Sequence, residues 1–178
     1  MNRALDISTS LAATLARFGS GVGVGRLGHR PEKPLELWEF EACPFCRKVR
    51  EALSILDLDA HIRPCPKGGP RYRPELVERA GKAQFPYLLD PNTGKEMYES
   101  NEIVSYLFET YGDGPPTWLL RAGPLNDLSA FSAALWRGSS GARYRESRAP
   151  ERELELYGFE ASPSCRIVRE ELCSLELP

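Results

Sequence analysis

The chain has 178 residues, a formal net charge of -2 and 42% hydrophobic residues. Its pI is about 5.8, and its 23 lysines and arginines are scattered, which argues against a basic face for nucleic acid or an anionic membrane. No apolar run approaches the ~20 residues that a membrane-spanning helix needs. The length suits one globular domain, or one small domain with part of a second.

Residues 1–33 are predicted to form an N-terminal extension. The run LDISTSLAATLARF, residues 5–18, favours a short amphipathic helix with one apolar side, made of Leu5, Leu11, Leu15 and Phe18. The motif GVGRLG, residues 23–28, formally matches the GxGxxG dinucleotide fingerprint. That fingerprint requires a strand before it and a helix after it, and neither is indicated here. We therefore expect a Gly-rich loop.

The extension leaves two cellular locations open. Polar residues interrupt its apolar core, which argues against a secretory signal peptide. Its serines and arginines, with one acidic residue before Glu32, would suit a transit peptide for a plastid or another organelle; the arginines are Arg3, Arg17, Arg26 and Arg30. A cytoplasmic protein is the preferred expectation.

Residues 34–112 alternate between strand and helix patterns. The apolar run at 35–40 indicates a buried strand, and Pro44 suits the first turn of the next helix because its missing N–H is not needed there. Apolar positions continue that helix through Leu56. Further elements are expected as a strand at 60–64, a short helix at 74–81, a strand at 85–90, a strand after the turn at 90–94, and a helix at 100–112 capped by Ser100.

This β-α-β-α-β-β-α order predicts an α/β domain with a mixed four-stranded sheet and helices on both faces. Two strands joined through a helix should be parallel, whereas two strands joined by a tight turn must be antiparallel. Residues 113–153 are poor in core residues and are predicted to be a linker. One helix is expected inside it, at 124–136, with an apolar side that packs on another element and consists of Leu125, Leu128, Phe131 and Leu135.

The last 25 residues repeat an earlier segment. Residues 154–178 align without gaps on 35–59 at an offset of 119, and 15 of the 25 positions are identical, which indicates an internal duplication. This second copy contains only one predicted strand and one predicted helix. A lone β-α unit cannot bury enough surface to offset its ordering entropy. Either the copy is truncated, which we favour, or it packs on the first domain, the linker or another molecule.

The five cysteines are spaced too unevenly for a disulfide framework: they are Cys43, Cys46, Cys65, Cys165 and Cys173. Cys43 and Cys46 would supply half of a tetrahedral zinc shell, but no second CxxC or HxxxH motif completes it, so no metal is expected. A working thiol pair in a reducing compartment fits better. Cys43 would lie at the start of a helix, where unpaired N–H groups and the helix dipole stabilise an anion.

Three motifs in this order resemble a known family. ACPFC, residues 42–46, at a strand-to-helix turn resembles the glutaredoxin and thioredoxin active site. QFP, residues 84–86, stands where that fold carries a cis-proline, and YESNEI, residues 98–103, is similar to the Glu/Gln-Ser-x-x-Ile signature of the glutathione transferase N-terminal domain. From residue 35 onward the chain resembles the bacterial and plastid proteins with two tandem domains of this glutaredoxin-like kind, the second copy being cut short. The resemblance implies a thioredoxin-like fold.

The resemblance also implies a thiol–disulfide site. Cys43 would be the attacking thiolate and Cys46 the resolving thiol. A thiol at a helix N-terminus falls from an ordinary pKa of ~8.5 into a range of roughly 3.5 to 7.5. The alternative is that both cysteines are small structural residues. Arg47 and Lys48 would add positive potential, although solvated surface charges are the preferred interpretation for both.

Glutathione is the co-substrate that the resemblance implies. The backbone of Phe85, before a cis Pro86, would pair with the cysteinyl part of glutathione, Glu99 would bind its α-ammonium group, and Ser100 its α-carboxylate. Ser100 as a plain helix cap is the alternative. Lys67 would meet the glycyl carboxylate. Glutaredoxins usually carry a lysine just before CxxC, where this chain has Glu41 and Ala42.

The remaining cysteines are expected to have lesser roles. Cys65 is a candidate regulatory thiol, although a buried bystander is the preferred interpretation. In the second copy Ser162 replaces the attacking cysteine and Cys165 keeps the resolving position. That copy lacks the proline strand and the Glu-Ser pair, so we expect no independent activity from it. Cys173 is expected to be a packing residue.

Three functions remain open. The first is a glutathione-linked thiol–disulfide oxidoreductase that uses Cys43 and Cys46 on glutathione or protein disulfides. The second is a glutathione transferase that conjugates an electrophile, against which the absence of the usual all-helical second domain argues. The third is a non-catalytic binding module. Neither nucleic acid nor a membrane is expected as a partner.

Overall fold

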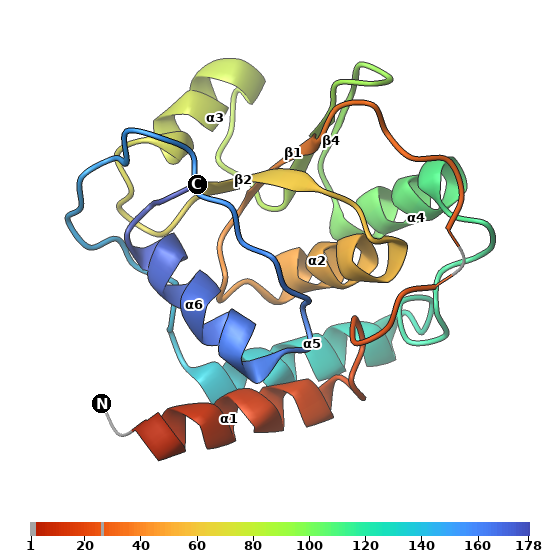
Figure 1. Ribbon diagram of the computed structural model, residues 1–178, viewed down its shortest axis with the longest axis horizontal. Helices are drawn as coiled ribbons and strands as arrows, with labels where there is room; N and C mark the ends of the chain where they lie inside the picture. The colour runs from red at the N-terminus through yellow and green to blue at the C-terminus, as the bar shows by residue number, and fades with distance from the viewer. Residues whose placement is uncertain (1–2, 26) are drawn as a thin grey trace.

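Figure 1 shows the computed structural model of the chain, which describes residues 3–25 and 27–178. Arg26, part of the predicted Gly-rich loop and of the arginines considered for targeting, lies outside the described residues. The described helices and strands are α1 (Arg3–Ala16), β1 (Leu35–Glu39), α2 (Pro44–Leu56), β2 (Ala60–Pro64), α3 (Tyr72–Ala80), β3 (Tyr87–Asp90), β4 (Lys95–Met97), α4 (Ser100–Tyr111), α5 (Pro124–Arg137) and α6 (Pro163–Ser174).

The four strands form one mixed sheet in the order β2-β1-β3-β4. β1 pairs in parallel with β2 and antiparallel with β3, and β3 pairs antiparallel with β4. The crossover through α2 allows the parallel pair, and the tight turn before β4 forces the antiparallel one. The predicted α/β, thioredoxin-like fold of residues 34–112 is therefore confirmed.

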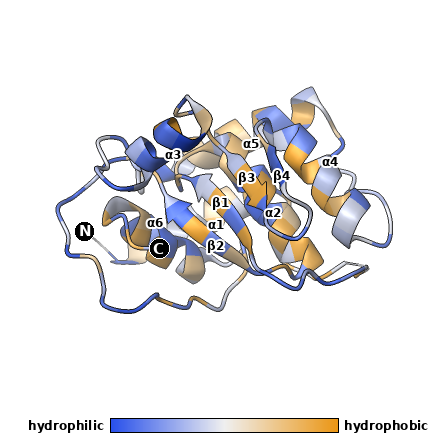
Figure 2. Ribbon diagram, turned by 90° about the horizontal axis from the view of Figure 1, so that it is seen from above, coloured by the Kyte–Doolittle hydropathy of each residue, from blue (hydrophilic) through white to orange (hydrophobic). Residues whose placement is uncertain are grey.

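Helices cover both faces of this sheet (Figure 1). On one face α2 and α4 pack together and on the sheet, and the buried side chains of this larger core include Leu37, Leu88, Val49, Ile103 and Leu107. On the other face α3 closes a smaller core of Trp38, Cys65, Leu76 and Tyr87. Figure 2 shows the apolar residues of β3, α2 and α4 in orange. The sheet is therefore buried on both sides, which holds its strand ends in place.

Helices α1 and α5 lie side by side, but not through the faces that their sequences suggest. The apolar side of α5 that was predicted to pack on another element is exposed: Leu128 and Leu135 are 68% and 81% accessible. The apolar side expected for the N-terminal helix is exposed as well; it consists of Leu5, Leu11, Leu15 and Phe18. Small residues are buried instead, among them Ala13 of α1 and Ala133 of α5. Small side chains let two helices approach closely. Because they occupy little space, long polar side chains fit beside them at the contact.

The second copy forms its helix, α6, but not its strand. No strand is found in residues 154–159 of the described chain, and Tyr157 is 88% exposed. The expectation of a complete β-α unit is therefore wrong in its first half. A strand needs a neighbour to pair its backbone N–H and C=O groups, and the described sheet ends at β2 on one side and at β4 on the other.

A buried arginine joins the N-terminal helix to α2 and α5. Arg17, just after α1, is 1% exposed. Its Nε donates to Glu51 of α2 at 2.7 Å. Its remaining nitrogens donate to Asn126 Oδ1 at 2.8 Å and to the Ser129 hydroxyl of α5. The extension is thus held to the thioredoxin-like domain by a buried ion pair with additional hydrogen bonds.

A second buried arginine repeats this arrangement in the opposite direction. Arg137, at the end of α5, donates to Glu170 of α6 at 2.7 Å, to Asp6 of α1 at 2.6 Å and to the Thr9 hydroxyl. Glu170 is the equivalent of Glu51 at the repeat offset of 119. Arg17, just after α1, thus pairs with a glutamate of α2 and contacts α5. Arg137, at the end of α5, pairs with a glutamate of α6 and contacts α1. Such reciprocal contacts are what a two-fold arrangement produces.

Gly141 marks a close approach at this contact. Its φ is +75°, and a Cβ added there would lie 2.8 Å from Glu41 Cβ and 3.2 Å from the Glu170 backbone. Gly138 has a similar φ of +60° but no atom within 4 Å of an added Cβ. We expect Gly141→Ala to lower the free energy of unfolding by roughly 1–3 kcal/mol more than Gly138→Ala, measured by urea denaturation. Equal losses would mean that only the backbone conformation matters.

Candidate active site

The loops that carry the predicted site residues leave the sheet at one end. β1 ends beside the end of β2, because Glu39 pairs with Pro64, and it ends beside the start of β3, because Trp38 pairs with Tyr87. β4 ends beside the start of β3, because Leu88 pairs with Met97. The CPFC turn, the loop with Lys67, the Phe85–Pro86 pair and Glu99 therefore all lie at this end of the sheet.

Cys43 is the N-cap residue of α2. The Cys46 backbone N–H donates to its Sγ at 3.3 Å, in the position where a serine or aspartate usually caps a helix. The pKa of Cys43 is lowered by a hydrogen bond from the Cys46 thiol and by the backbone N–H groups of Cys46 and Phe45, against the opposing effect of burial. Only 4% of the residue is exposed. The geometry thus favours the thiolate form of Cys43.

Cys46 lies one turn further along α2 and is fully buried. Burial, together with the hydrogen bond and charge of Cys43, raises the pKa of its thiol well above the ordinary value. The two thiols therefore differ in the way that a nucleophile and a resolving thiol require: one is ionised first, and the other keeps its proton.

The peptide bond between Phe85 and Pro86 is cis, as expected from the QFP motif. The Phe85 ring meets Phe40 edge to face at a centroid distance of 5.8 Å. The guanidinium of Arg73 lies 4.8 Å from the Phe85 ring and donates to the backbone carbonyls of Cys65 and Pro66. These contacts hold the loop before β3 against the turn that leads to Cys43.

Ser100 does not cap α4, contrary to the prediction. Glu99 is the N-cap residue, with a φ of +65°, and its side chain makes no capping hydrogen bond. Ser100 is the first helical residue and is buried. The turn at Glu99 brings its carboxylate to the cis-proline loop, where it accepts a hydrogen bond from Gln84 Nε2 at 2.5 Å. The two predicted ligands Glu99 and Ser100 thus stand at a helix N-terminus beside Pro86.

Lys67 lies at the same end of the sheet but in a loop that the C-terminal part of the chain holds. Its backbone N–H donates to the Ala142 carbonyl at 2.7 Å, and its carbonyl accepts from the Tyr144 N–H at 3.0 Å. Its side chain is exposed. Glu176, near the C-terminus, also contacts this region: its carboxylate accepts a hydrogen bond from the backbone N–H of Tyr72 at 3.0 Å, where the loop enters α3. Nothing in these contacts places the Lys67 ammonium near Cys43.

Arg47 and Lys48 are buried rather than solvated, which corrects the expectation for both. Arg47 is 2% exposed and lies 3.5 Å from Glu160. The ammonium of Lys48 donates to Asp127 of α5 at 2.7 Å and to Asn101 of α4 at 2.8 Å. Both side chains lie outside the apolar stripe of α2, but that side of the helix is covered by other parts of the chain that supply polar partners: α4 and α5 for Lys48, and Glu160, just before α6, for Arg47.

Helix α5 also forms a wall beside the CPFC motif. Phe45, between the two cysteines, meets Phe131 of α5 edge to face at a centroid distance of 5.4 Å. Both side chains remain partly exposed. This contact could not be predicted from the sequence, because no local pattern relates residue 45 to residue 131.

The other cysteines are free thiols, as are Cys43 and Cys46. Cys65 and Cys173 are buried, and burial raises the pKa of both. Cys173 packs between the two copies, since it donates to the Gly141 carbonyl and accepts from the Glu41 N–H. In residues 3–25 and 27–178 we find no group of three His, Cys, Asp or Glu side chains placed to hold a metal ion. The same part of the chain contains no helix with the length and apolar character to cross a membrane.

The fold and the site together define a class. A β-α-β-α-β-β-α domain with a Cys-x-x-Cys pair at its first helix and a cis-proline before its third strand is a thioredoxin-like domain. Residues 37–116, less than half of the chain, match the family model described as the glutathione S-transferase N-terminal domain.

Solved structures add two similar chains, both of the glutathione transferase BmGSTD1 of Bombyx mori. One is 27% identical with a TM-score of 0.42, and the other, in complex with GTT, is 28% identical with a TM-score of 0.43. Each match covers 53% of this chain and 45% of the Bombyx mori chain, so this protein spans less than half of that length. No curated protein matches the chain.

Proposed function

We propose that the protein is a glutathione-linked thiol–disulfide oxidoreductase that acts through Cys43 and Cys46. The observation that carries the proposal is the position of Cys43 as the N-cap of α2, where a hydrogen bond from the Cys46 thiol and the first backbone N–H groups of the helix lower the pKa of its thiol. The thiolate is the reactive form of cysteine, so a site built to ionise Cys43 suits attack on a disulfide. The match of residues 37–116 to the glutathione S-transferase N-terminal domain supports glutathione as the co-substrate.

The reaction follows from the order in which the two thiols ionise. The Cys43 thiolate attacks one sulfur of the substrate disulfide, a Cys43–substrate disulfide forms, and the other sulfur leaves as a thiolate. Cys46 then loses its proton and attacks the Cys43 sulfur, which releases the second substrate thiolate and leaves a Cys43–Cys46 disulfide. Two glutathione molecules return two electrons by the same exchange and leave as glutathione disulfide.

The glutathione site is proposed at the end of the sheet where the predicted ligands meet. Glu99 would pair with the α-ammonium group of glutathione, and Ser100 and the first N–H groups of α4 would bind its α-carboxylate. The backbone of Phe85 would pair with the cysteinyl part. Lys67 would meet the glycyl carboxylate, which requires its exposed side chain to turn toward Cys43.

A glutathione transferase is the second candidate. The family match supports it equally, and the wall formed by Phe45 and Phe131 offers an apolar surface beside the thiols for an electrophile. In that reaction the sulfur of bound glutathione is the nucleophile, and no covalent bond to the protein forms. The two candidates therefore differ in whether glutathione becomes attached to Cys43.

The test is to trap that covalent intermediate. We expect a Cys46→Ser variant incubated with glutathione disulfide to gain one glutathionyl group, because the Cys43 thiolate displaces glutathione thiolate and no resolving thiol remains. Intact mass and peptide mapping would locate the adduct. No adduct, together with conjugation of a chlorinated nitrobenzene to glutathione, would establish the transferase instead. If neither the adduct nor the conjugation product is found, the protein is a non-catalytic binding module.

A further inference from the structure

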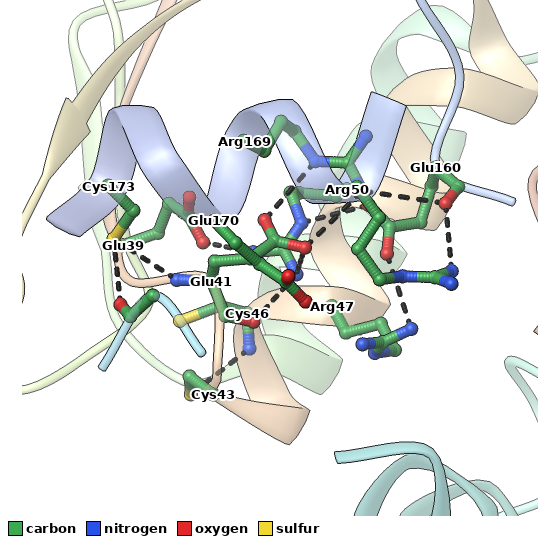
Figure 3. Close-up of polar contacts among 12 residues, drawn as sticks. Glu39, Glu41, Cys43, Cys46, Arg47, Arg50, Glu160, Arg169, Glu170 and Cys173 are labelled. Atoms are coloured by element: carbon green, nitrogen blue, oxygen red, sulfur yellow. Dashed lines mark hydrogen bonds and ion pairs between the residues drawn. The ribbon is translucent and has the colours of Figure 1, made fainter. Parts of the chain in front are cut away.

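Four charged residues form a closed ring of ion pairs between α2 and α6, at the side of the thiol site (Figure 3). Arg50 Nε lies 2.9 Å from Glu160, and Arg169 Nη2 lies 2.7 Å from the same carboxylate. Arg169 Nε then lies 3.2 Å from Glu41, and Arg50 Nη2 lies 3.3 Å from Glu41. Glu41, Arg50 and Glu160 are buried, and the Arg169 side chain is 17% exposed. The ring is therefore largely shielded from solvent.

The ring takes equivalent residues from the two repeated segments. Glu160 stands 119 positions after Glu41, and Arg169 stands 119 positions after Arg50. Each arginine touches both glutamates, so each segment contributes one cation and one anion. Neither segment can close the ring alone.

One further carboxylate binds this ring on the first segment only. Glu39, the last residue of β1, makes a buried ion pair with Arg50. Its equivalent in the second segment is Gly158, just as the equivalent of Cys43 is Ser162. A Cβ added at Gly158 would lie 2.8 Å from Cys165 Sγ, so this position of the motif borders the second cysteine. The segment that carries two thiols is thus also the one that carries the additional carboxylate.

The charge of Glu39 depends on the ring. Burial raises the pKa of Glu39 to about 7, Arg50 and Arg169 oppose that effect, and Glu41 and Glu160 add to it. The pKa of Cys43 is lowered overall, chiefly by the Cys46 thiol, and that of Cys46 is raised chiefly by burial; the negative charge of Glu39 acts on both in the raising direction. The titratable and charged groups that act on Glu39 or are acted on by it are Arg50, Glu41, Glu160, Arg169, Cys43, Cys46, Cys65 and Cys173.

We propose that Glu160 and Arg169 of the second segment are positioning residues for the thiol site: by closing the ring with Glu41 and Arg50 they set the charge of Glu39, and through it the reactivity of Cys43 and Cys46. The second segment thereby contributes to the site although it carries no nucleophile of its own. This inference rests on the proposed role of the two cysteines in disulfide exchange.

The test is the rate of Cys43 alkylation by iodoacetamide as a function of pH, resolved by peptide mapping. The profile of the wild-type protein should contain an inflection near pH 7 that comes from Glu39 and disappears in Glu39→Gln. Glu160→Gln removes an anion and should move this inflection down by on the order of one pH unit, whereas Arg169→Gln removes a cation and should move it up by a similar amount. Loss of packing alone would not produce shifts of opposite sign.

Glu170→Gln is the matched control. Glu170 is a buried glutamate of the same helix, and its ion pair is with Arg137 rather than with Arg50. We expect the inflection to stay where it is in this variant. Should Glu160→Gln not fold, as judged by circular dichroism, Arg169→Gln carries the test because its side chain is partly exposed. Shifts of the same sign in both ring variants, or no shift in either, would overturn the inference.

Failure of the proposed function would look different. In that case Cys43 of the wild-type protein would titrate as an ordinary thiol, and no glutathione adduct would form on Cys46→Ser. The ring would still be tested by the carboxyl stretching band of Glu39 in infrared difference spectra of the wild-type protein and of Glu160→Gln. A lowered pKa of Cys43 in the wild-type protein, with the same pH profile in Glu160→Gln and Arg169→Gln, would support the proposed function and contradict the positioning role.

Discussion

Replacing Cys43 with serine is expected to slow the reduction of a glutathione mixed disulfide by at least ~10³-fold. A serine hydroxyl does not ionise near neutral pH, so it cannot displace a sulfur from a disulfide. The rate would be measured in a coupled assay that follows glutathione disulfide formation. Activity that survives the substitution would show that the sulfur of Cys43 is not the nucleophile.

The geometry of the second segment indicates that the Cys43→Ser variant keeps its fold. Ser162 occupies the position of Cys43 there and accepts a hydrogen bond from the Cys165 N–H at 3.3 Å, the same distance as between Cys43 and the Cys46 N–H. Serine is also a favourable N-cap residue. The matched control is Cys165→Ser, which changes the same motif in the second segment and should leave the rate unchanged. Its thiol has no part in the proposed exchange.

Glu51→Gln is expected to lower the free energy of unfolding by on the order of 3–5 kcal/mol, because it leaves the Arg17 charge buried without a counter-ion. The side chains of Glu51 and Arg17 are only 1% and 2% exposed, so solvent screens the unpaired charge little. Gln has nearly the shape of Glu, so the packing of α2 against α5 should change little. Urea unfolding followed by circular dichroism measures the loss.

The control for this prediction is an exposed ion pair. Asp57, which ends α2 in a left-handed conformation, pairs with Arg30 at 2.7 Å, and more than half of each side chain is exposed. Asn tolerates that backbone conformation, so Asp57→Asn should cost no more than about 1 kcal/mol. Similar losses in the two variants would mean that burial of the Arg17–Glu51 pair does not determine its contribution.

The elements of residues 34–112 could be predicted because their signals are local. Apolar runs and turn residues marked β1 to β4, and the register of α2 followed from Pro44 and the apolar stripe after it. The start of α2 also placed Cys43 at a helix N-terminus, one turn before Cys46, and the Cys46 thiol and the N–H groups of that turn lower its pKa. The contacts that lower the pKa of Cys43 therefore come from its own turn of helix.

The partners of the charged residues on α2 could not be predicted in the same way. Arg47 and Lys48 were expected to be solvated, because a residue is known to be buried only when the element that covers it is known. The covering elements are α5 and α6, which lie some 80 to 120 positions further along the chain. The repeat offset of 119 was the one available signal, since it makes Glu41 and Glu160 equivalent.

The same reason explains the errors on α1, α5 and the second strand. Periodicity predicted both helices correctly but not which side is buried, because small residues and a long arginine make a close contact that a hydrophobic pattern does not record. Residues 154–158 share three of five positions with β1 yet form no strand among the described residues. By itself the sequence determined the local elements and the position of the thiols. Tertiary structure decided which faces are buried and which charges lie beside the site, because both depend on contacts between distant parts of the chain.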